Sequence, residues 1–381
     1  MFIKDIALYN FRNYEEAFVE FSSGINIMGG MNGQGKTNLL EAVAFLSTGK
    51  AFRTRKDADV IMFDRDEASI RATTCSDGTC DLIEARLYAK EKRKQIFING
   101  VRQKNAALLP GKLGTVLFCP EDLYLARDGS SIRRSFLDRA IEQLRPRYGG
   151  ALREYNRLLE HKTRILRDWK EKPSLLDMLD DFSLRMVHYG AVIVSYRAAY
   201  VEKLNPVAAR IHGEISGGTE ELELKYRTVS NIDNPNLTAE ELRPLLEEHY
   251  FMRKQSEIDS RSCLSGPHKD DLEIKLSGRA IKDFGSQGQV RTAVLSMKLA
   301  ERDMYKNDTG TCPVMLLDDV LSELDAVRQN YILNRIEDGQ VIITCCTDPE
   351  DIRSVRGKMF RISQGCVYER RDEDVSASWT G

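Results

Sequence analysis

The stretch that decides the fold is "GGMNGQGKTNLLEA" (residues 29–42), which directly follows the apolar run "INIMG" (residues 25–29). It fits the pattern G-x-x-x-x-G-K-[ST]. The apolar run is typical of a buried strand, and the residues after the pattern predict a helix. Apolar side chains recur there at helical spacing: Leu39, Leu40, Val43 and Leu46. A strand, a glycine-rich turn and a helix N-terminus together present backbone N–H groups to one point, where the helix dipole favours an anion.

The side chains of this turn predict a nucleotide site. Lys36 is placed to reach the β- and γ-phosphates, and the Thr37 hydroxyl is placed to bind Mg²⁺. An ordinary strand-to-helix turn would also use glycine for tightness, but the complete pattern with both flanks favours a nucleotide. We therefore predict ATP and Mg²⁺ as ligands. The predicted contacts come from Gly30, Met31, Asn32, Gly33, Gln34, Gly35, Lys36 and Thr37.

A second apolar strand ends in two aspartates, within "PVMLLDDVLSELD" (residues 313–325). This is the Walker B arrangement, which delivers carboxylates to the edge of an open α/β sheet where ligands bind. We predict that Asp318 acts on Mg²⁺ and that Asp319 polarises the attacking water, so both join Lys36 as catalytic candidates. Alone, the pair could equally cap the next helix. The presence of the lysine pattern favours the catalytic interpretation.

A third motif precedes the aspartates. "KDFGSQGQVRTAVLSMKLAE" (residues 282–301) places a glycine- and serine-rich turn ahead of an expected helix. It resembles the signature motif of ABC-type ATPases, where such a turn faces a second nucleotide. Short glycine turns are common, so the motif gains its weight from its position ahead of Walker B. We predict nucleotide contacts from Ser286, Gly288 and Gln289, and "SELD" (residues 322–325) stands where these ATPases carry their D-loop.

Composition excludes several classes. The 381 residues carry a formal net charge of −2, with 42% hydrophobic and 30% charged residues, which is typical of a soluble globular protein of two or three domains. No run of about 18 apolar residues predicts a membrane span. The eight cysteines contain no C-x-x-C pair, which favours free, mostly buried thiols in a reducing cytosol. We therefore expect a cytoplasmic protein with no membrane partner.

The chain is expected to form two lobes. Residues 1–125 are expected to form short strands of an ATPase lobe, and residues 305–381 are expected to complete that lobe. Residues 126–304 are expected to form a mostly helical lobe that carries the signature turn. One amphipathic helix is expected near 131–144, capped by Ser130 or Ser131, and a longer one near 175–204. Sustained heptads are missing. The predicted fold class is α/β: an ABC/SMC-type ATPase head with a mixed sheet around the P-loop, and a helical second lobe without a long coiled coil.

Seven stretches along the chain resemble the RecF family of bacterial gap-repair ATPases, which is related to SMC proteins. They are "NFRNY" (10–14), "GMNGQGKTNLLEA" (30–42), "FCPEDL" (118–123), "RRSFLD" (133–138), "SGPHKDD" (265–271), "SQGQ" (286–289) and "MLLDDVLSELD" (315–325). The resemblance implies an ATP-dependent DNA-binding protein of recombinational gap repair. It implies a weak, DNA-stimulated ATPase that dimerises on ATP, with the signature of one copy closing over the nucleotide of the other. It also implies double-stranded DNA and gap junctions as partners, together with RecR, and RecO and RecA in the same pathway, with RecA loaded at single-strand/double-strand boundaries.

Two departures from the broader ABC pattern affect the expected chemistry. "TCCTD" (residues 344–348) stands where many ABC ATPases have a switch histidine. No Q-loop glutamine is obvious, and the nearest polar residues are Glu121 and Asp122. The γ-phosphate sensor is therefore not identified, and we expect slow hydrolysis.

Local basic clusters are the candidate DNA contacts. Between residues 127 and 170 there are 12 Lys/Arg against 6 Asp/Glu, which suits phosphate contacts without sequence readout. The candidates are Arg53, Arg55, Lys56, Lys92, Lys94, Arg133 and Arg134. Solvated faces are an equal alternative, and Arg134 could simply pair with Asp138. Two other classes stay open, an ABC ATPase that serves a membrane transporter and a P-loop kinase or small-molecule NTPase.

Overall fold

The computed structural model describes residues 1–54, 56–90, 94–230, 232–321, 324–335, 338–346 and 357–369. The chain divides into two compact units. A discontinuous unit combines 1–122 with 301–381, and a helical unit comprises 123–300. The sequence predicts boundaries at 125 and 304. Each unit is described by itself.

The first sheet of the discontinuous unit is antiparallel, with the order β2-β1-β4-β5-β6-β7. Its strands are β1 (Phe2–Phe11), β2 (Tyr14–Glu20), β4 (Glu67–Ser76), β5 (Thr79–Tyr88), β6 (Lys94–Ile98) and β7 (Val101–Gln103). Two of its hairpins turn through residue pairs with positive φ, Asp77-Gly78 and Asn99-Gly100. Such pairs match the right-handed twist of the strands they connect.

The second sheet is mixed, with the order β15-β14-β3-β13-β12-β8. Its strands are β3 (Ile25–Gly29), β8 (Thr115–Phe118), β12 (Val314–Asp318), β13 (Val341–Cys345), β14 (Lys358–Ser363) and β15 (Cys366–Glu369). Strand β15 pairs antiparallel with β14, and the other pairings are parallel. Strands β12 and β13 are buried along their whole length, as expected for parallel strands that are covered on both faces.

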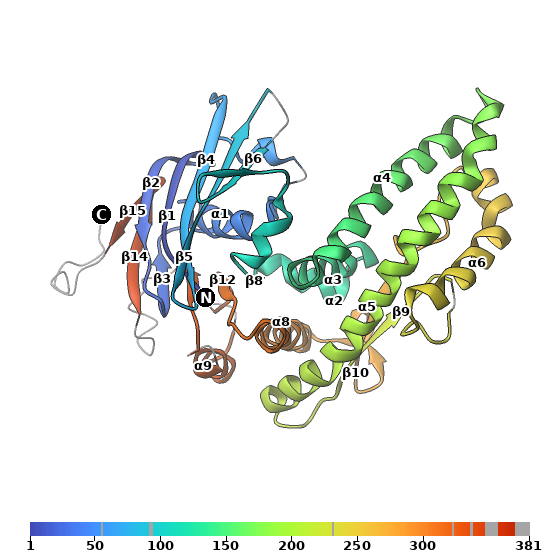
Figure 1. The fold of residues 1–381 in the computed structure, drawn as a ribbon. Coiled ribbons are helices and arrows are strands. Elements are labelled where there is room, and N and C mark those ends of the chain that lie inside the picture. Colours follow the sequence, from blue (N-terminus) through green and yellow to red (C-terminus); the bar gives the residue numbers. More distant parts are fainter. Residues whose placement is uncertain are drawn as a thin grey trace. The chain divides into compact units, whose positions relative to one another are not determined.

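Helix α1 (Lys36–Thr48) lies in the core that joins the two sheets (Figure 1). Leu39, Leu40, Val43 and Leu46 are fully buried, in agreement with the predicted spacing. Helix α9 (Ala326–Arg335) contributes Leu333 to a separate cluster around Ile27 of β3. The described residues also form the 3-10 turns η1 (Asp57–Val60), η2 (Ala106–Gly111) and, at the boundary with the helical unit, η3 (Pro120–Leu123).

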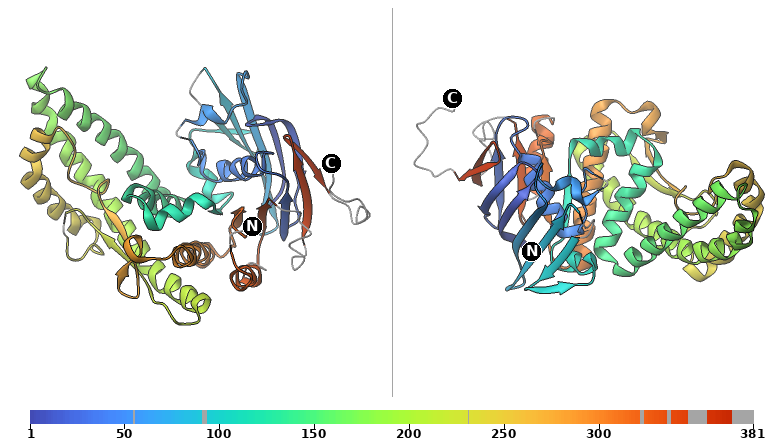
Figure 2. Two further views of the ribbon diagram at one scale, coloured as in Figure 1. Left: turned by 180° about the vertical axis from the view of Figure 1, so that it is seen from behind. Right: turned by 90° about the horizontal axis from the view of Figure 1, so that it is seen from above.

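The helical unit is built on long helices and a small sheet. Its helices are α2 (Tyr124–Arg127), α3 (Ser130–Leu144), α4 (Pro146–Asp168), η4 (Pro173–Met178), α5 (Leu179–Ser216), α6 (Ala239–Ser260), α7 (Ile281–Phe284) and the start of α8 (Gln287–Thr309). The antiparallel sheet has the order β11-β10-β9, from β9 (Leu222–Arg227), β10 (Asp271–Leu276) and β11 (Arg279–Ala280). Helices α4, α5 and α6 lie side by side (Figures 1 and 2). At about 1.5 Å per residue, the 38-residue α5 is far too short for an SMC-type arm. The predicted fold class is confirmed.

Two expectations about local structure are wrong. Cys75 and Cys80, expected as free thiols, form a disulfide, because the β4–β5 hairpin places them directly opposite each other with Cα atoms 4.1 Å apart. Ser130 is the first residue of α3 rather than its cap, and Gly129 precedes it without a side-chain cap. Among the described residues, no helix is long and apolar enough to cross a membrane.

Candidate functional site

The loop between β3 and α1 needs glycine for two reasons. Its backbone adopts angles that favour glycine, and neighbouring residues approach it too closely for a side chain. Gly30, Gly33 and Gly35 all have positive φ, at 155°, 79° and 121°, a region that side chains disfavour. A Cβ at Gly30 would lie 2.4 Å from the carbonyl oxygen of Ile362 on β14, and one at Gly35 would lie 2.8 Å from Asn13 Nδ2. The neighbouring strand and turn therefore require glycine at positions 30 and 35, whereas Gly33 is favoured by its backbone angle alone.

Lys36 is buried and folds back over this loop. Its Nζ donates to the carbonyl oxygens of Gly30 at 2.6 Å and Met31 at 3.1 Å. Met31, Asn32 and Gly33 are exposed at the tip of the loop. The ammonium therefore lies inside the loop, where incoming phosphate oxygens could replace the carbonyls as its acceptors.

Asp318, at the end of β12, is the centre of a hydrogen-bond network. Its Oδ1 accepts from Thr37 Oγ1 at 2.9 Å and from Thr344 Oγ1 at 2.8 Å. The Thr344 hydroxyl also accepts from the backbone N–H of Asp319 at 2.9 Å. Asp319 has a φ of 52°, which ends the strand directly after the first carboxylate. The structure thus brings three predicted residues together: Thr37, Asp318 and Asp319.

The oxygens at this point fit Mg²⁺. The Thr37 hydroxyl and the Asp318 carboxylate are hard oxygen donors, the type of ligand that Mg²⁺ takes. Burial raises the pKa of Asp318, although hydrogen bonds from Thr344 and Thr37 lower it, and the nearby charges of Asp319 and Glu121 raise it further. A divalent cation would offset this concentration of negative charge and would also neutralise phosphate oxygens.

A thiol lies where the sequence lacks a switch histidine. Cys346 Sγ, one residue beyond β13, donates to Asn32 Oδ1 at 2.7 Å and lies 3.7 Å from Lys36 Nζ. Burial raises the pKa of this thiol, and a hydrogen bond with Asp319 raises it further. Cys346 is therefore a neutral, weak donor that faces both the loop and the second aspartate. The position of Cys346 after the strand can be read from the sequence, but its contacts cannot.

Two turns that the nucleotide motif did not include support the loop. Asn13 Nδ2 donates to the Gln34 carbonyl at 2.8 Å, and the Tyr14 hydroxyl donates to the Gly35 carbonyl at 2.9 Å. From the β14–β15 turn, Gln364 N donates to Gln34 Oε1 at 2.6 Å. The quoted "NFRNY" stretch contains two of these residues, whereas no local signal could identify Gln364, which lies 330 residues from its partner.

Arg12, also in "NFRNY", pairs with Glu41 of α1. Its guanidinium makes two hydrogen bonds with that carboxylate, at 2.8 and 3.1 Å, and Glu41 is fully buried. Such a bidentate pair fixes both partners. It therefore holds the β1–β2 turn against the helix that follows the loop.

The signature turn lies in the helical unit, and its helix starts earlier than expected. Helix α8 begins at Gln287, so Gly288 and Gln289 lie in its first turn. Ser286 N donates to Gln289 Oε1 at 2.8 Å, and Gln289 N donates back to Ser286 Oγ at 3.3 Å. This reciprocal pair is a capping box. Of the D-loop stretch, residues 322 and 323 lie outside the described residues.

Two of the candidate DNA contacts are occupied by structural bonds. Arg133 is buried and makes two hydrogen bonds with the Asp271 carboxylate, at 2.7 and 2.9 Å. Arg134 donates to Ser130 Oγ and to the Asp270 carbonyl, each at 2.6 Å. The partner of Asp138 is Arg197 rather than Arg134. Arg133 and Arg134 therefore stabilise the helical unit.

The remaining DNA candidates differ in exposure. Arg53 and Lys56 are exposed, while Lys94 pairs with Asp57 at 2.5 Å. Arg55 and Lys92 lie outside the described residues.

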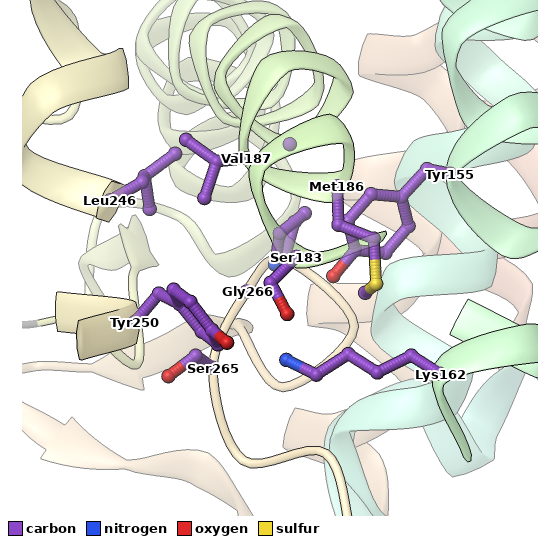
Figure 3. A pocket seen from close by; sticks show the side chains of 11 residues that line it. Tyr155, Lys162, Ser183, Met186, Val187, Leu246, Tyr250, Ser265 and Gly266 are labelled. Carbon is purple, nitrogen blue, oxygen red and sulfur yellow. The ribbon is translucent and has the colours of Figure 1, made fainter. Parts of the chain in front are cut away.

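A small, mostly apolar cavity of the helical unit, with Lys162 and Tyr250 in its lining, is shown in Figure 3. Lys162 Nζ lies 2.6 Å from the Glu257 carboxylate and 4.5 Å from the centre of the Tyr250 ring, toward which it points in the figure. The side chains of this ion pair are only 2% and 0% exposed. The Tyr250 hydroxyl donates to Asp180. These bonds connect α4, α5 and α6, so we assign the cavity a structural role.

The parallel strand, glycine-rich loop and buried helix, with a threonine bonded to an aspartate at the end of β12, define a P-loop ATPase head of the ABC/SMC type. The family model for the RecF/RecN/SMC N-terminal domain matches residues 2–364. The "DNA replication and repair protein RecF" of Clostridium perfringens is 38% identical over 371 residues, covering 96% of this chain and 99% of that protein. The chain belongs to the RecF family.

Solved structures agree with this assignment. Two structures of the recombination mediator protein RecF in the RecFOR pathway, RecF-ATPrS and RecF-ATP, match with TM-scores of 0.90 and 0.89. Both are 34% identical to this chain, and each comparison covers 97% of this chain and 98% of the other. An Smc head domain from Pyrococcus furiosus, bound to the C-terminal domain of ScpA, matches at 0.55 with 16% identity over 98% of this chain and 97% of that one. That last likeness concerns the fold alone.

Proposed function

We propose that this chain is an ATP-dependent DNA-binding protein of recombinational gap repair that hydrolyses ATP slowly. The observation that carries the proposal is the network from Thr37 through Asp318 and Thr344 to Asp319, beside the buried Lys36. It combines a phosphate-binding loop, a metal-binding oxygen pair and a second carboxylate at one sheet edge. The ATP-bound RecF structure supports ATP as the ligand.

Each residue of the network has a separate role in this proposal. Lys36 and the N–H groups of the loop bind the β- and γ-phosphates. Thr37 and Asp318 hold Mg²⁺, and Asp319 accepts a proton from the attacking water. Cys346 lies at the γ-phosphate end as a neutral donor, and its weakness as a donor accounts for slow turnover.

The proposed dimer and the partners follow from the family. ATP joins two copies because Ser286 of one copy donates to the γ-phosphate held by the other. The RecFOR pathway named with the RecF structures supports RecR and RecO as partners, with RecA loaded at gap junctions. Double-stranded DNA is bound through phosphates, without sequence readout.

The deciding experiment measures ATP hydrolysis with and without duplex DNA. Wild-type protein should hydrolyse ATP slowly and faster with DNA, while Lys36→Met should neither bind nor hydrolyse ATP. Lys4→Met, which removes an exposed lysine on β1 outside the loop and the basic clusters, is the matched control and should bind ATP normally. Unchanged ATP affinity in Lys36→Met would refute the site, and phosphoryl transfer to a small metabolite would favour a kinase instead.

A further inference from the structure

The signature turn is connected to the core of the helical unit by a chain of polar side chains. Gln289 Nε2 donates to Glu220 Oε1 at 2.8 Å, and Glu220 Oε2 lies 3.2 Å from His212 Nε2. His212, on α5, is fully buried, and its Nδ1 lies 3.4 Å from the hydroxyl of Ser296, which is also fully buried. The chain therefore runs from the exposed Ser286 into the core. We call Gln289, Glu220 and His212 the signature relay.

Glu220 determines which way the Gln289 amide points. In the observed orientation, Gln289 Oε1 accepts from the backbone N–H of Ser286, and Nε2 donates to Glu220. Reversing the amide would set two N–H groups against each other at Ser286 and two oxygens against each other at Glu220. The carboxylate therefore selects one amide orientation.

That orientation leaves the Ser286 hydroxyl as a donor. A serine hydroxyl has one proton and two lone pairs, and Ser286 Oγ already accepts from the Gln289 N–H at 3.3 Å. Within the described residues, no hydrogen bond uses the Ser286 hydroxyl proton. The capping box thus fixes the oxygen in place while the proton stays available to an acceptor outside the helix.

His212 supplies the balancing donor at the inner end. A carboxylate next to a phosphate site would repel the phosphate, because like charges disfavour each other at short range. His212 Nε2 faces Glu220 at 3.2 Å, and its ring is held from the other side by Ser296. A proton on His212 Nε2 therefore attracts the negative charge of Glu220 on the side of the carboxylate that faces the interior.

We propose that Glu220 and His212 are positioning residues for the signature serine. They hold Gln289 so that Ser286 presents its hydroxyl proton to the γ-phosphate of ATP bound by a second copy. This rests on the proposed ATP-dependent dimer, and it adds two residues of the helical unit to that site. Through His212, the position of α5 is also coupled to the signature turn.

The sharpest variant is Gln289→Glu. A serine followed three residues later by glutamate is itself a capping box, so the start of α8 is preserved. The new carboxylate faces Glu220, however, and the relay is broken. The double variant Glu220→Gln/Gln289→Glu exchanges donor and acceptor, so that Gln at 220 donates to Glu at 289 and still accepts from His212. It restores both the complementarity and the net charge.

The readouts are kcat for ATP hydrolysis, ATP affinity of the monomer and ATP-dependent sedimentation. Gln289→Glu should lower kcat about tenfold and weaken dimerisation, as expected for a lost hydrogen bond to a charged group. Monomer ATP affinity should not change. The double variant should recover kcat to within about threefold of wild type on the same basis.

Two further variants guard against a folding artefact. Glu220→Ala should lower kcat as Gln289→Glu does, whereas Glu221→Ala should hydrolyse ATP like wild type. Glu221 is an exposed neighbour whose bonds to Ser277 use only its backbone. Normal kcat in Gln289→Glu or in Glu220→Ala, or a double variant no better than the single one, would overturn the relay. A wild-type protein that neither dimerises with ATP nor hydrolyses it would overturn the proposed function, and the relay with it.

Discussion

At the scale of single residues, Asp319 and Asp318 are adjacent carboxylates with separable effects. Asp318 bonds Thr37 and Thr344, so Asp318→Asn should raise the Mg²⁺ concentration needed for hydrolysis. Asp319→Asn should bind ATP as wild type does, but hydrolyse it about a hundredfold more slowly, the usual scale for losing a general base. Equilibrium ATP binding and single-turnover hydrolysis, each across a Mg²⁺ series, separate the two. Identical Mg²⁺ dependence in both variants would contradict this division.

Cys346 gives a prediction in the opposite direction, a gain of activity. Burial and Asp319 raise the pKa of its thiol, so under the proposed function it would meet the γ-phosphate as a neutral, weak donor. Cys346→His should raise kcat by about tenfold, because a stronger donor stabilises the transition state by about 1.4 kcal/mol more. Cys346→Ala is the control, because it removes the donor and should hydrolyse ATP no faster than wild type. Hydrolysis by Cys346→His no faster than by Cys346→Ala would show that Cys346 is not at the sensor position.

The residues of the nucleotide loop could be predicted from the sequence because their chemistry is local. Lys36 and Thr37 stand at fixed distances from Gly30 in the chain, and the strand and helix on either side determine where they point. The contact of Gln364 with Gln34, and the relay from His212 to Gln289, depend on how distant segments pack. No spacing in the chain encodes them. For the same reason Arg133, predicted as a DNA contact, is bound to Asp271, 138 residues away.

At the scale of elements, helix α4 carries exposed arginines that are not among the individual candidates, although one of them, Arg157, is paired with Glu154. Three exposed arginines recur at helical spacing along it: Arg153, Arg157 and Arg164. Replacing each with glutamine should weaken binding to all duplex sequences alike and reduce the slope of log K against log salt by about one per phosphate contact. Lys203→Gln, an exposed lysine on α5, is the control. Sequence-dependent losses, or an unchanged salt slope, would exclude this surface.

The "SGPHKDD" loop predicts an acid-sensitive helical unit. His268 Nδ1 lies 2.6 Å from the Tyr155 hydroxyl, and burial lowers the pKa of His268 to about 4. The unfolded chain therefore binds a proton below about pH 6.5 that the folded chain does not bind until about pH 4. Stability should fall as the pH drops through this window, by about 2 kcal/mol between pH 7 and pH 5 from this group.

The test is denaturant unfolding at the two pH values. His268→Gln should be less stable than wild type at pH 7 but lose less stability on acidification, whereas His188→Gln, an exposed histidine on α5, should behave like wild type. Equal acid sensitivity in His268→Gln and wild type would rule out this residue as the cause.

Element types could be predicted better than element ends. The short strands of residues 1–125 could be predicted, and the turns at Asp77-Gly78 and Asn99-Gly100 between them use residues that tolerate positive φ. Helix α5, predicted at 175–204, runs from Leu179 to Ser216, because its last turns bury Ile211 and His212 and contact β9 and α8 through Asn205 and His212. The Cys75–Cys80 bond was missed because cysteine spacing alone did not reveal that the hairpin register sets them opposite each other.

At the scale of the whole molecule, the central prediction is an ATP-dependent dimer with two shared sites. Each chain has one glycine-rich loop, in the discontinuous unit, and one signature turn, in the helical unit. A two-fold pair would complete both sites at once, as an isologous interface requires. ADP lacks the γ-phosphate that Ser286 would bind, so hydrolysis should loosen the pair and release DNA.

Mixing two inactive variants tests this directly by sedimentation. Ser286→Arg should bind ATP but not dimerise, and Lys36→Met should do neither. A mixed dimer pairs the intact loop of the Ser286→Arg chain with the intact signature of the Lys36→Met chain, so it retains one complete site. Weak heterodimers with residual hydrolysis should therefore appear in the mixture, although neither variant self-associates. Exposed Ser131, on α3 outside the signature, supplies the matched control Ser131→Arg, which should dimerise normally. If Ser286→Arg alone dimerises with ATP as wild type does, the two sites are not shared between copies.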